Sequence, residues 1–89
     1  MIKILDFYAD WCQPCKVLAP ILQDIEEEFN YITLEKINIE EDPDTAEKYS
    51  IRNVPTLIFF KDNKQVDKIV GVVSRDKIKT MIAKYNNAA

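Results

Sequence analysis

The chain has 89 residues, of which 47% are hydrophobic and 30% charged, so its composition is that of a globular domain. This length has no room for a second hydrophobic core, and we expect a single domain over residues 1–89. Fifteen acidic and twelve basic side chains give a net charge of −3, which argues against nucleic acid as the main partner. No apolar run approaches the ~20 residues of a membrane span, and the N-terminus lacks the pattern of a signal peptide, so we expect a cytoplasmic protein with no membrane partner.

The first half of the chain predicts a strand, a helix and a second strand. Residues 4–9, ILDFYA, form a nearly unbroken apolar run, which is typical of a strand buried on both faces. A helix from Gln13 to Phe29 is expected next, because five apolar residues follow helical spacing: Leu18, Ile21, Leu22, Ile25 and Phe29. Pro14 lies in its first turn, where a missing N–H costs nothing, whereas Pro20 lies in its interior and should kink it. Residues 31–39, YITLEKINI, are expected to form the second strand.

The second half predicts a short helix, a hairpin and a last helix. Residues 42–49 begin with an aspartate N-cap and a proline at the first helical position. Residues 56–60 and 66–70 are expected to form two strands, joined through a turn at residues 62–63. Ser74 should cap the last helix, which has four apolar residues on one face: Ile78, Met81, Ile82 and Tyr85.

The expected element order is therefore β-α-β-α-β-β-α. A strand–helix–strand unit takes a right-handed crossover, which makes its two strands parallel, and the hairpin adds an antiparallel pair. We predict an α/β fold with a four-stranded mixed sheet flanked by helices on both faces. Residues 86–89 follow the last helix and should fray.

The only two cysteines, Cys12 and Cys15, lie two residues apart in ADWCQPCK. As a structural disulfide, so short a loop would contribute at most ~2 kcal/mol, against ~4–5 kcal/mol for a bridge that spans a domain. A zinc site normally needs four ligands, and the chain has no histidine and no third cysteine. Only a site shared between two chains would work, and we expect no metal.

Redox chemistry is the third interpretation, and it explains where the pair lies. Cys12 should be at the N-terminus of a helix, where unpaired N–H groups and the helix dipole favour a thiolate. Cys15 follows one turn later on the same side, within reach of the first sulfur. One thiol can then attack and the other resolve. A Cys-x-x-Cys pair at a strand-to-helix junction of a β-α-β unit is a strong signal of such a centre.

The residues around this pair resemble the thioredoxin family. DFYADWCQPCK, Pro20, INIEEDP, the VPT of residues 54–56, and Gly71 occur in the order and with the spacing of that family, from about Ile4 to Tyr85. The resemblance implies a protein-disulfide reductase that needs no bound cofactor, acts on disulfide-containing proteins and is recharged by a thioredoxin reductase.

The resemblance also implies roles for individual residues. Cys12 would be the nucleophile and Cys15 the resolving thiol, joined as a disulfide in the oxidised form. Asp6 would be the buried proton acceptor near the resolving thiol, with Lys36 beside it. Pro55, in the cis form, would face the disulfide and help to hold a substrate strand. The docking groove would include Trp11, Gln13, Pro14, Val54, Gly71 and Val72.

The chain departs from the family pattern in three ways. We expect the family's leading strand and helix to be absent, Gln13 stands where glycine is common, and Asn63 replaces glycine in the hairpin turn. The missing strand pairs, in the family, with the strand at residues 31–39, which we therefore expect to be an open sheet edge. Glu35 and Lys36 place charges on both faces of that edge, and charges there disfavour association. We expect a monomer.

Ordinary structural interpretations remain open for several of these residues. Asp6 could be a hydrogen-bonded polar residue, although the middle of an apolar strand is a costly place for a carboxylate. Lys36 could simply be solvated, Trp11 could belong to the core, and Pro55 could be trans, since only ~5–6% of X–Pro bonds are cis.

Two other functions remain open as well. The first is a glutaredoxin-like reductase that uses glutathione, against which Pro14 and the neighbouring Trp11 argue. The second is a thioredoxin-fold scaffold within a larger complex, against which the intact cysteine pair argues. Reduction of a protein disulfide with a thioredoxin reductase, or with glutathione, as electron source distinguishes all three functions.

Overall fold

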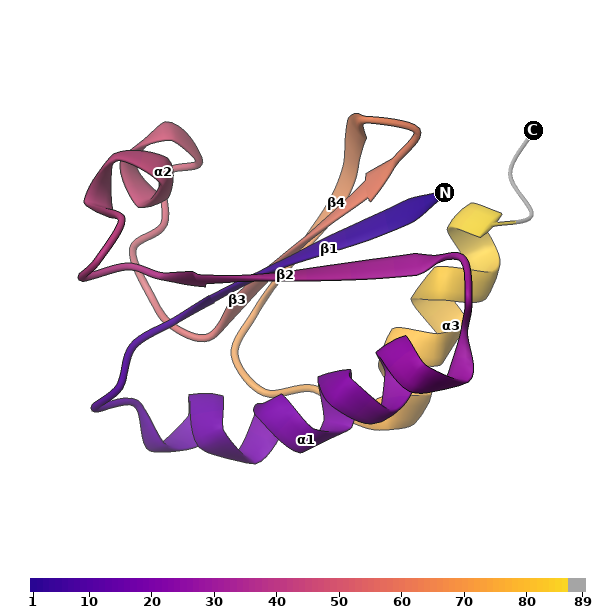
Figure 1. The fold of residues 1–89 in the computed structure, drawn as a ribbon, viewed down its shortest axis with the longest axis horizontal. Helices are drawn as coiled ribbons and strands as arrows, with labels where there is room; N and C mark the ends of the chain where they lie inside the picture. The colour runs from indigo at the N-terminus through magenta and orange to yellow at the C-terminus, as the bar shows by residue number, and fades with distance from the viewer. Residues whose placement is uncertain (87–89) are drawn as a thin grey trace.

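The computed structural model describes residues 1–86, and its four strands form one mixed sheet in the order β2-β1-β3-β4 (Figure 1). The strands are β1 (Ile2–Tyr8), β2 (Ile32–Asn38), β3 (Thr56–Lys61) and β4 (Lys64–Val70). Strand β1 pairs in parallel with β2 and antiparallel with β3, and β3 pairs antiparallel with β4. The predicted element order and mixed sheet are confirmed. Within the described residues, β2 forms one edge of the sheet, as expected, and β4 forms the other.

The strand ends differ from the predicted ones because pairing extends them. Strand β1 begins at Ile2 rather than at residue 4, since Ile2 pairs with both neighbouring strands. Strand β4 begins at Lys64, which pairs with Lys61 across a two-residue turn. The two turn residues, Asp62 and Asn63, have φ angles of 49° and 69°. This is the twist that suits a tight hairpin, and an aspartate followed by an asparagine adopts it more readily than most residue pairs.

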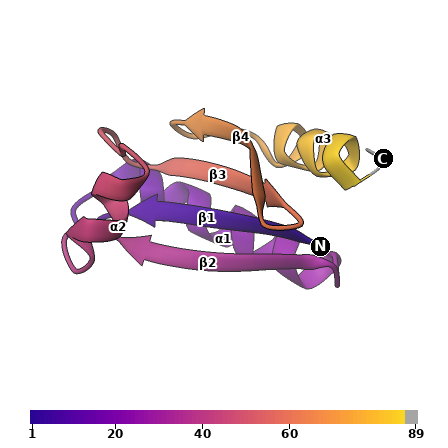
Figure 2. The same ribbon diagram turned by 90° about the horizontal axis from the view of Figure 1, so that it is seen from above.

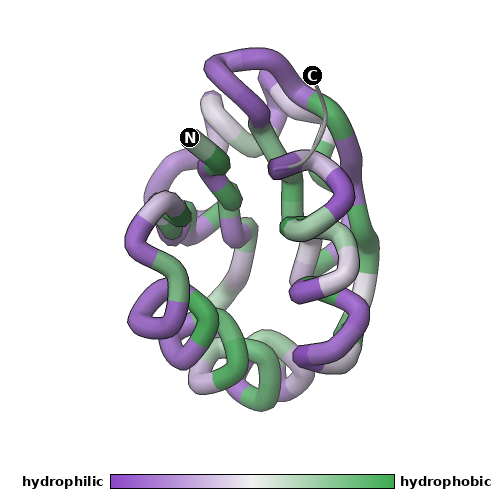
Figure 3. Tube along the Cα trace, turned by 90° about the vertical axis from the view of Figure 1, so that its right-hand side faces the viewer, coloured by the Kyte–Doolittle hydropathy of each residue, from purple (hydrophilic) through white to green (hydrophobic). Residues whose placement is uncertain are grey.

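Helices cover both faces of the sheet (Figures 1 and 2). The long helix α1 (Gln13–Glu28) and the last helix α3 (Arg75–Asn86) lie on one face, and the short helix α2 (Pro43–Lys48) lies on the other. Helix α1 continues through Pro20, and the hydropathy colours in Figure 3 alternate along the helices, as expected when one side is buried. Helix α3 extends to Asn86, the first residue of the predicted frayed tail, and residues 87–89 lie outside the described part. No helix within residues 1–86 has the length and apolarity needed to cross a bilayer.

Alternation along β1 divides its side chains between two cores. Ile2 and Ile4 pack in the larger core under α1 and α3, whereas Leu5 and Phe7 pack in the smaller core under α2. The larger core consists of Ile2, Ile4, Leu18, Leu22, Ile25, Ile32, Leu57, Phe59, Ile78, Met81 and Ile82. Because side chains of a strand alternate between faces, Asp6 lies on the α1 side, in line with the larger core.

Candidate active site

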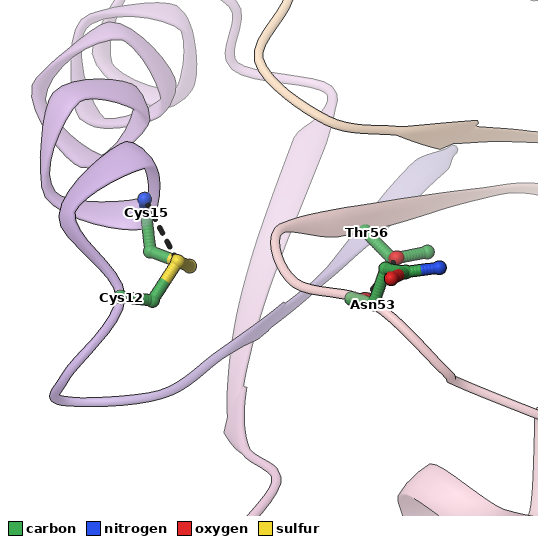
Figure 4. Close-up of a disulfide and its surroundings, with 4 residues drawn as sticks. All are labelled: Cys12, Cys15, Asn53 and Thr56. Atoms are coloured by element: carbon green, nitrogen blue, oxygen red, sulfur yellow. Dashed lines mark hydrogen bonds between the residues drawn. A yellow bond between two sulfur atoms is a disulfide. The ribbon is translucent and has the colours of Figure 1, made fainter.

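The two cysteines lie where β1 ends and α1 begins. Cys12 is the N-cap of α1, with an extended backbone conformation (φ −89°, ψ 104°), and Pro14 occupies the first turn. The sulfur of Cys12 accepts a hydrogen bond from the backbone N–H of Cys15 at 3.2 Å, and the two residues form a disulfide (Figure 4). When the pair is reduced, this N–H and the helix N-terminus are placed to stabilise negative charge on the Cys12 sulfur.

Exposure does not distinguish the two cysteines, but their neighbours do. Cys12 is 3% exposed and Cys15 is 5% exposed. Cys15 lines a pocket of about 360 Å³ beside α1, whose other lining residues are Asp6, Tyr8, Ala9, Asp10, Lys16, Ala19 and Lys36. The two sulfurs are therefore chemically unequal: one accepts a helix N–H, and the other belongs to a pocket that holds a buried carboxyl group.

That carboxyl group belongs to Asp6, which is 4% exposed. Burial raises its pKa from 3.8 to about 6, and the positive charge of Lys36 acts in the opposite direction. Lys36 is the direct partner of Asp6 in the parallel pairing of β1 with β2, so both side chains point to the same face. The structure thus brings together Cys15, Asp6 and Lys36, and gives Asp6 a pKa near neutrality.

A loop before β3 lies across from the disulfide. Val54 packs against the cluster that contains both cysteines, and the Val54–Pro55 peptide bond is cis, as predicted. The Thr56 hydroxyl donates to the Asn53 carbonyl at 2.6 Å, which joins the two ends of the loop (Figure 4). The backbone N–H of Gly71 donates to the Pro55 carbonyl at 2.8 Å and links this loop to the end of β4.

The surroundings of the disulfide carry exposed apolar side chains. Trp11 is 63% exposed, so it is not part of the core, and Gln13 and Pro14 are exposed at the start of α1. Gly71 has a φ of 94°, a conformation that favours glycine, and is followed by the exposed Val72.

Comparisons with known proteins agree on one family. The thioredoxin family model matches residues 1–84. Thioredoxin from Chlamydia caviae is 41% identical over 85 residues, which cover 96% of this chain and 83% of that protein. Thioredoxin from Buchnera aphidicola subsp. Baizongia pistaciae is 46% identical over 83 residues, covering 92% and 76%. The solved structure of a mutant thioredoxin from Halobacterium salinarum matches with a TM-score of 0.92 and 36% identity, covering 99% of this chain and 77% of that one.

This chain belongs to the thioredoxin family. Its fold is the thioredoxin fold, and its activity is that of a thioredoxin-type protein dithiol–disulfide oxidoreductase, exchanging disulfides through Cys12 and Cys15. Membership also implies, in general terms, disulfide-containing proteins as substrates and a reductase as partner. The predicted fold and activity are confirmed, and the thioredoxin-type reductase is favoured over the glutathione-dependent alternative.

The structure of this thioredoxin-family chain also contains site residues that sequence reasoning missed. The buried side chain of Asn38, at the end of β2, accepts from the N–H groups of Glu40 and Glu41 and donates to Asp10 at 3.4 Å. It thereby ties β2 to the segment that precedes Cys12. An asparagine at a strand end that accepts from N–H groups two and three residues later is typical of a turn, and its position could have been recognised. The hydrogen bond from Thr56 to the Asn53 carbonyl had no comparable signal, because it depends on the path of the loop between them.

Proposed function

We propose that this chain reduces protein disulfides with Cys12 as the attacking thiol, Cys15 as the resolving thiol and Asp6 as the proton acceptor. The observation that supports this assignment is the unequal surroundings of the two sulfurs. Cys12 receives the N–H at the start of α1, which favours its thiolate, whereas Cys15 shares a pocket with a buried carboxyl group.

The first step forms a mixed disulfide. The Cys12 thiolate attacks one sulfur of the substrate disulfide, a new S–S bond forms, and the other substrate sulfur leaves as a thiolate that takes a proton from solvent. At this stage the Cys15 thiol is still protonated and lies one helical turn away, with Cα atoms 5.3 Å apart.

The second step releases the reduced substrate. Asp6 takes the proton of Cys15, and the resulting thiolate attacks the sulfur of Cys12. The Cys12–Cys15 disulfide forms and the second substrate sulfur leaves as a thiolate, so that two electrons pass to the substrate. A pKa of about 6 keeps Asp6 largely ionised at neutral pH, yet basic enough to accept a proton. Lys36 moderates this pKa by favouring the ionised form.

The substrate is proposed to lie in a groove that surrounds the disulfide. Its contact residues are Trp11, Gln13, Pro14, Val54, Pro55, Gly71 and Val72. Support comes from the exposure of Trp11, from the packing of Val54 against the cysteine cluster, and from the hydrogen bond that ties Gly71 to Pro55. For the complete cycle we propose a thioredoxin reductase as electron donor, a cytoplasmic setting and a monomeric protein.

Trapping of the mixed disulfide tests the assignment. Cys15→Ser should accumulate a covalent adduct with a small protein that carries a surface disulfide, because the resolving step is removed. Cys12→Ser is the matched control and should form no adduct. Non-reducing electrophoresis and mass spectrometry detect the adduct. Trapping by the Cys12 variant instead of the Cys15 variant would reverse the roles of the two thiols. If the native protein reduced the substrate disulfide neither with a thioredoxin reductase nor with glutathione as electron donor, the scaffold function would be favoured.

A further inference from the structure

The charges of this chain are sorted along its sequence. Residues 1–50 contain four basic and twelve acidic side chains, a net charge of −8, whereas residues 51–89 contain eight basic and three acidic ones, a net charge of +5. An overall charge of −3 conceals this asymmetry. Asymmetry between the two parts of a chain indicates a partner that meets only one of them.

The fold keeps the two kinds of charge apart. The acidic part supplies α1, α2 and the edge strand β2, whereas the basic part supplies β3, α3 and the opposite edge strand β4 (Figure 2). Between β4 and α3 lies a groove of about 330 Å³, lined by Asp67, Lys68, Ile69, Lys77, Thr80, Met81 and Lys84. We call it the cationic groove, after Lys77 and Lys84 of α3; Lys68 borders it from β4, where its side chain alternates with Asp67 and Ile69 and begins on the opposite face of the strand.

The lysines of the cationic groove differ from the other cations of α3. Arg75 and Lys79 point toward α1 and form ion pairs with Asp24 and Glu28. Lys77 and Lys84 on the same helix, and Lys68 on β4, have no ion-pair partner within residues 1–86. The cations on one side of α3 thus pair with carboxylates of α1, whereas Lys77 and Lys84 on the other side have no such pairing in the described part of the chain.

The groove contains one compensating charge. Asp67 accepts a hydrogen bond from the Tyr85 hydroxyl at 2.6 Å, and this bond holds its pKa below the usual value, with smaller contributions from Lys77 and Lys84. The two lysines of α3 and this carboxylate leave a net charge of +1 over a floor that includes Ile69 and Met81, and Lys68 adds a positive charge at the border on β4.

Strand β4 joins the cationic groove to the loop that lies across from the disulfide. Strand β4 ends at Val70, and Gly71 follows directly and bonds to the Pro55 loop. The side chains of Val70 and Val72, on either side of Gly71, are exposed. A protein whose disulfide lies at Cys12 can therefore extend along the outer side of β4 and meet the lysines.

We propose that the cationic groove selects protein substrates with acidic residues beside their disulfide. This inference rests on the substrate groove proposed above and adds the chemical class of the substrate. Positive charge in the groove increases mainly the association rate of an acidic segment, and salt removes this increase because it screens the charges. The acidic side of the molecule, around α2 and the end of α1, repels the same segments and so limits them to one orientation.

Three peptides with the same disulfide loop but acidic, neutral or basic flanking residues provide the test. We expect the native protein to reduce the acidic peptide about tenfold faster, in kcat/KM, than the basic one at low salt, and less than about threefold faster at 0.5 M salt. A triple variant with Lys68→Gln, Lys77→Gln and Lys84→Gln should lose this preference.

The matched control removes three lysines elsewhere. Lys3→Gln, Lys48→Gln and Lys79→Gln change the net charge by the same amount, and these lysines contact Glu35, the Tyr49 ring and Glu28 outside the groove. The control should keep the preference. Equal losses in both triple variants would show an effect of net charge alone and overturn the proposal, as would a native protein without preference.

The neutral peptide separates this proposal from the proposed redox mechanism. All three proteins should reduce it at the same rate if the redox centre is intact, so that a loss confined to the acidic peptide is assigned to the groove. A single-stranded oligonucleotide of the same charge serves as competitor. Inhibition as strong as that by a non-reducible acidic peptide would identify a general polyanion site and overturn the selection of acidic proteins.

Discussion

Replacement of Asp6 by asparagine tests the physical basis of the proposed proton acceptor. Burial raises the pKa of this carboxyl group to about 6 in the folded protein, whereas an exposed aspartate in the unfolded chain has a pKa near 3.9. A shift of about two pKa units corresponds to about 3 kcal/mol of folding free energy. Because the folded state holds its proton more tightly than the unfolded state, stability is complete below about pH 4, falls between about pH 4 and pH 6, and stays reduced above.

Asp6→Asn removes the loss of folding stability above about pH 4, because an amide of the same shape carries no charge. We expect the variant to exceed the native oxidised protein by about 2–3 kcal/mol in unfolding free energy at pH 8, and by almost nothing at pH 4, where both side chains are neutral. This figure already includes the opposing interaction with Lys36, because that interaction is part of the pKa of about 6. For a domain of this size, 1 kcal/mol moves Tm by roughly 4–8 °C, so a rise of at least about 8 °C is expected at pH 8.

Guanidinium unfolding of the oxidised proteins at pH 4 and pH 8 provides the measurement. Asp10→Asn is the control, because Asp10 lines the same pocket but is exposed, and its variant should show no comparable dependence on pH. The same gain at both pH values, or no gain at pH 8, would refute burial of the charge as the cause. In the reduced protein, Asp6→Asn should slow the resolving step that follows formation of the mixed disulfide.

Three further predictions concern the cysteines, the loop before β3 and the open edge. Alkylation of the reduced protein near neutral pH should modify Cys12 before Cys15, and mass spectrometry showing the opposite order would reverse their roles. Thr56→Val removes the hydrogen bond to Asn53 and should lower the unfolding free energy by about 1–3 kcal/mol, whereas Thr56→Ser keeps the hydroxyl and should cost less. Analytical ultracentrifugation should find a monomer from micromolar to near-millimolar concentration; a tight dimer at micromolar concentration would contradict the prediction that the charges of β2 protect its edge.

Features that depend only on neighbouring residues could be predicted from the sequence alone. Helical spacing in α1, the aspartate and proline at the start of α2, and the turn at Asp62 and Asn63 are local, and each was predicted within one or two residues. The position of Cys12 at a helix N-terminus is also local, because it requires only that a helix begin after an apolar strand. Propensity, capping and turn chemistry suffice for such features.

Features that join distant parts of the chain were decided by the tertiary structure. The raised pKa of Asp6 requires α1 to cover the face of β1 on which it lies, and Lys36 reaches it only through the register of β1 with β2. The Pro55 loop faces Cys12 because β3 pairs with β1, although more than forty residues separate them in sequence. Likewise, composition shows that charge is sorted along the chain, but only the packing of α3 between α1 and β4 decides which lysines are neutralised and which remain free, since an ion pair depends on distance in space.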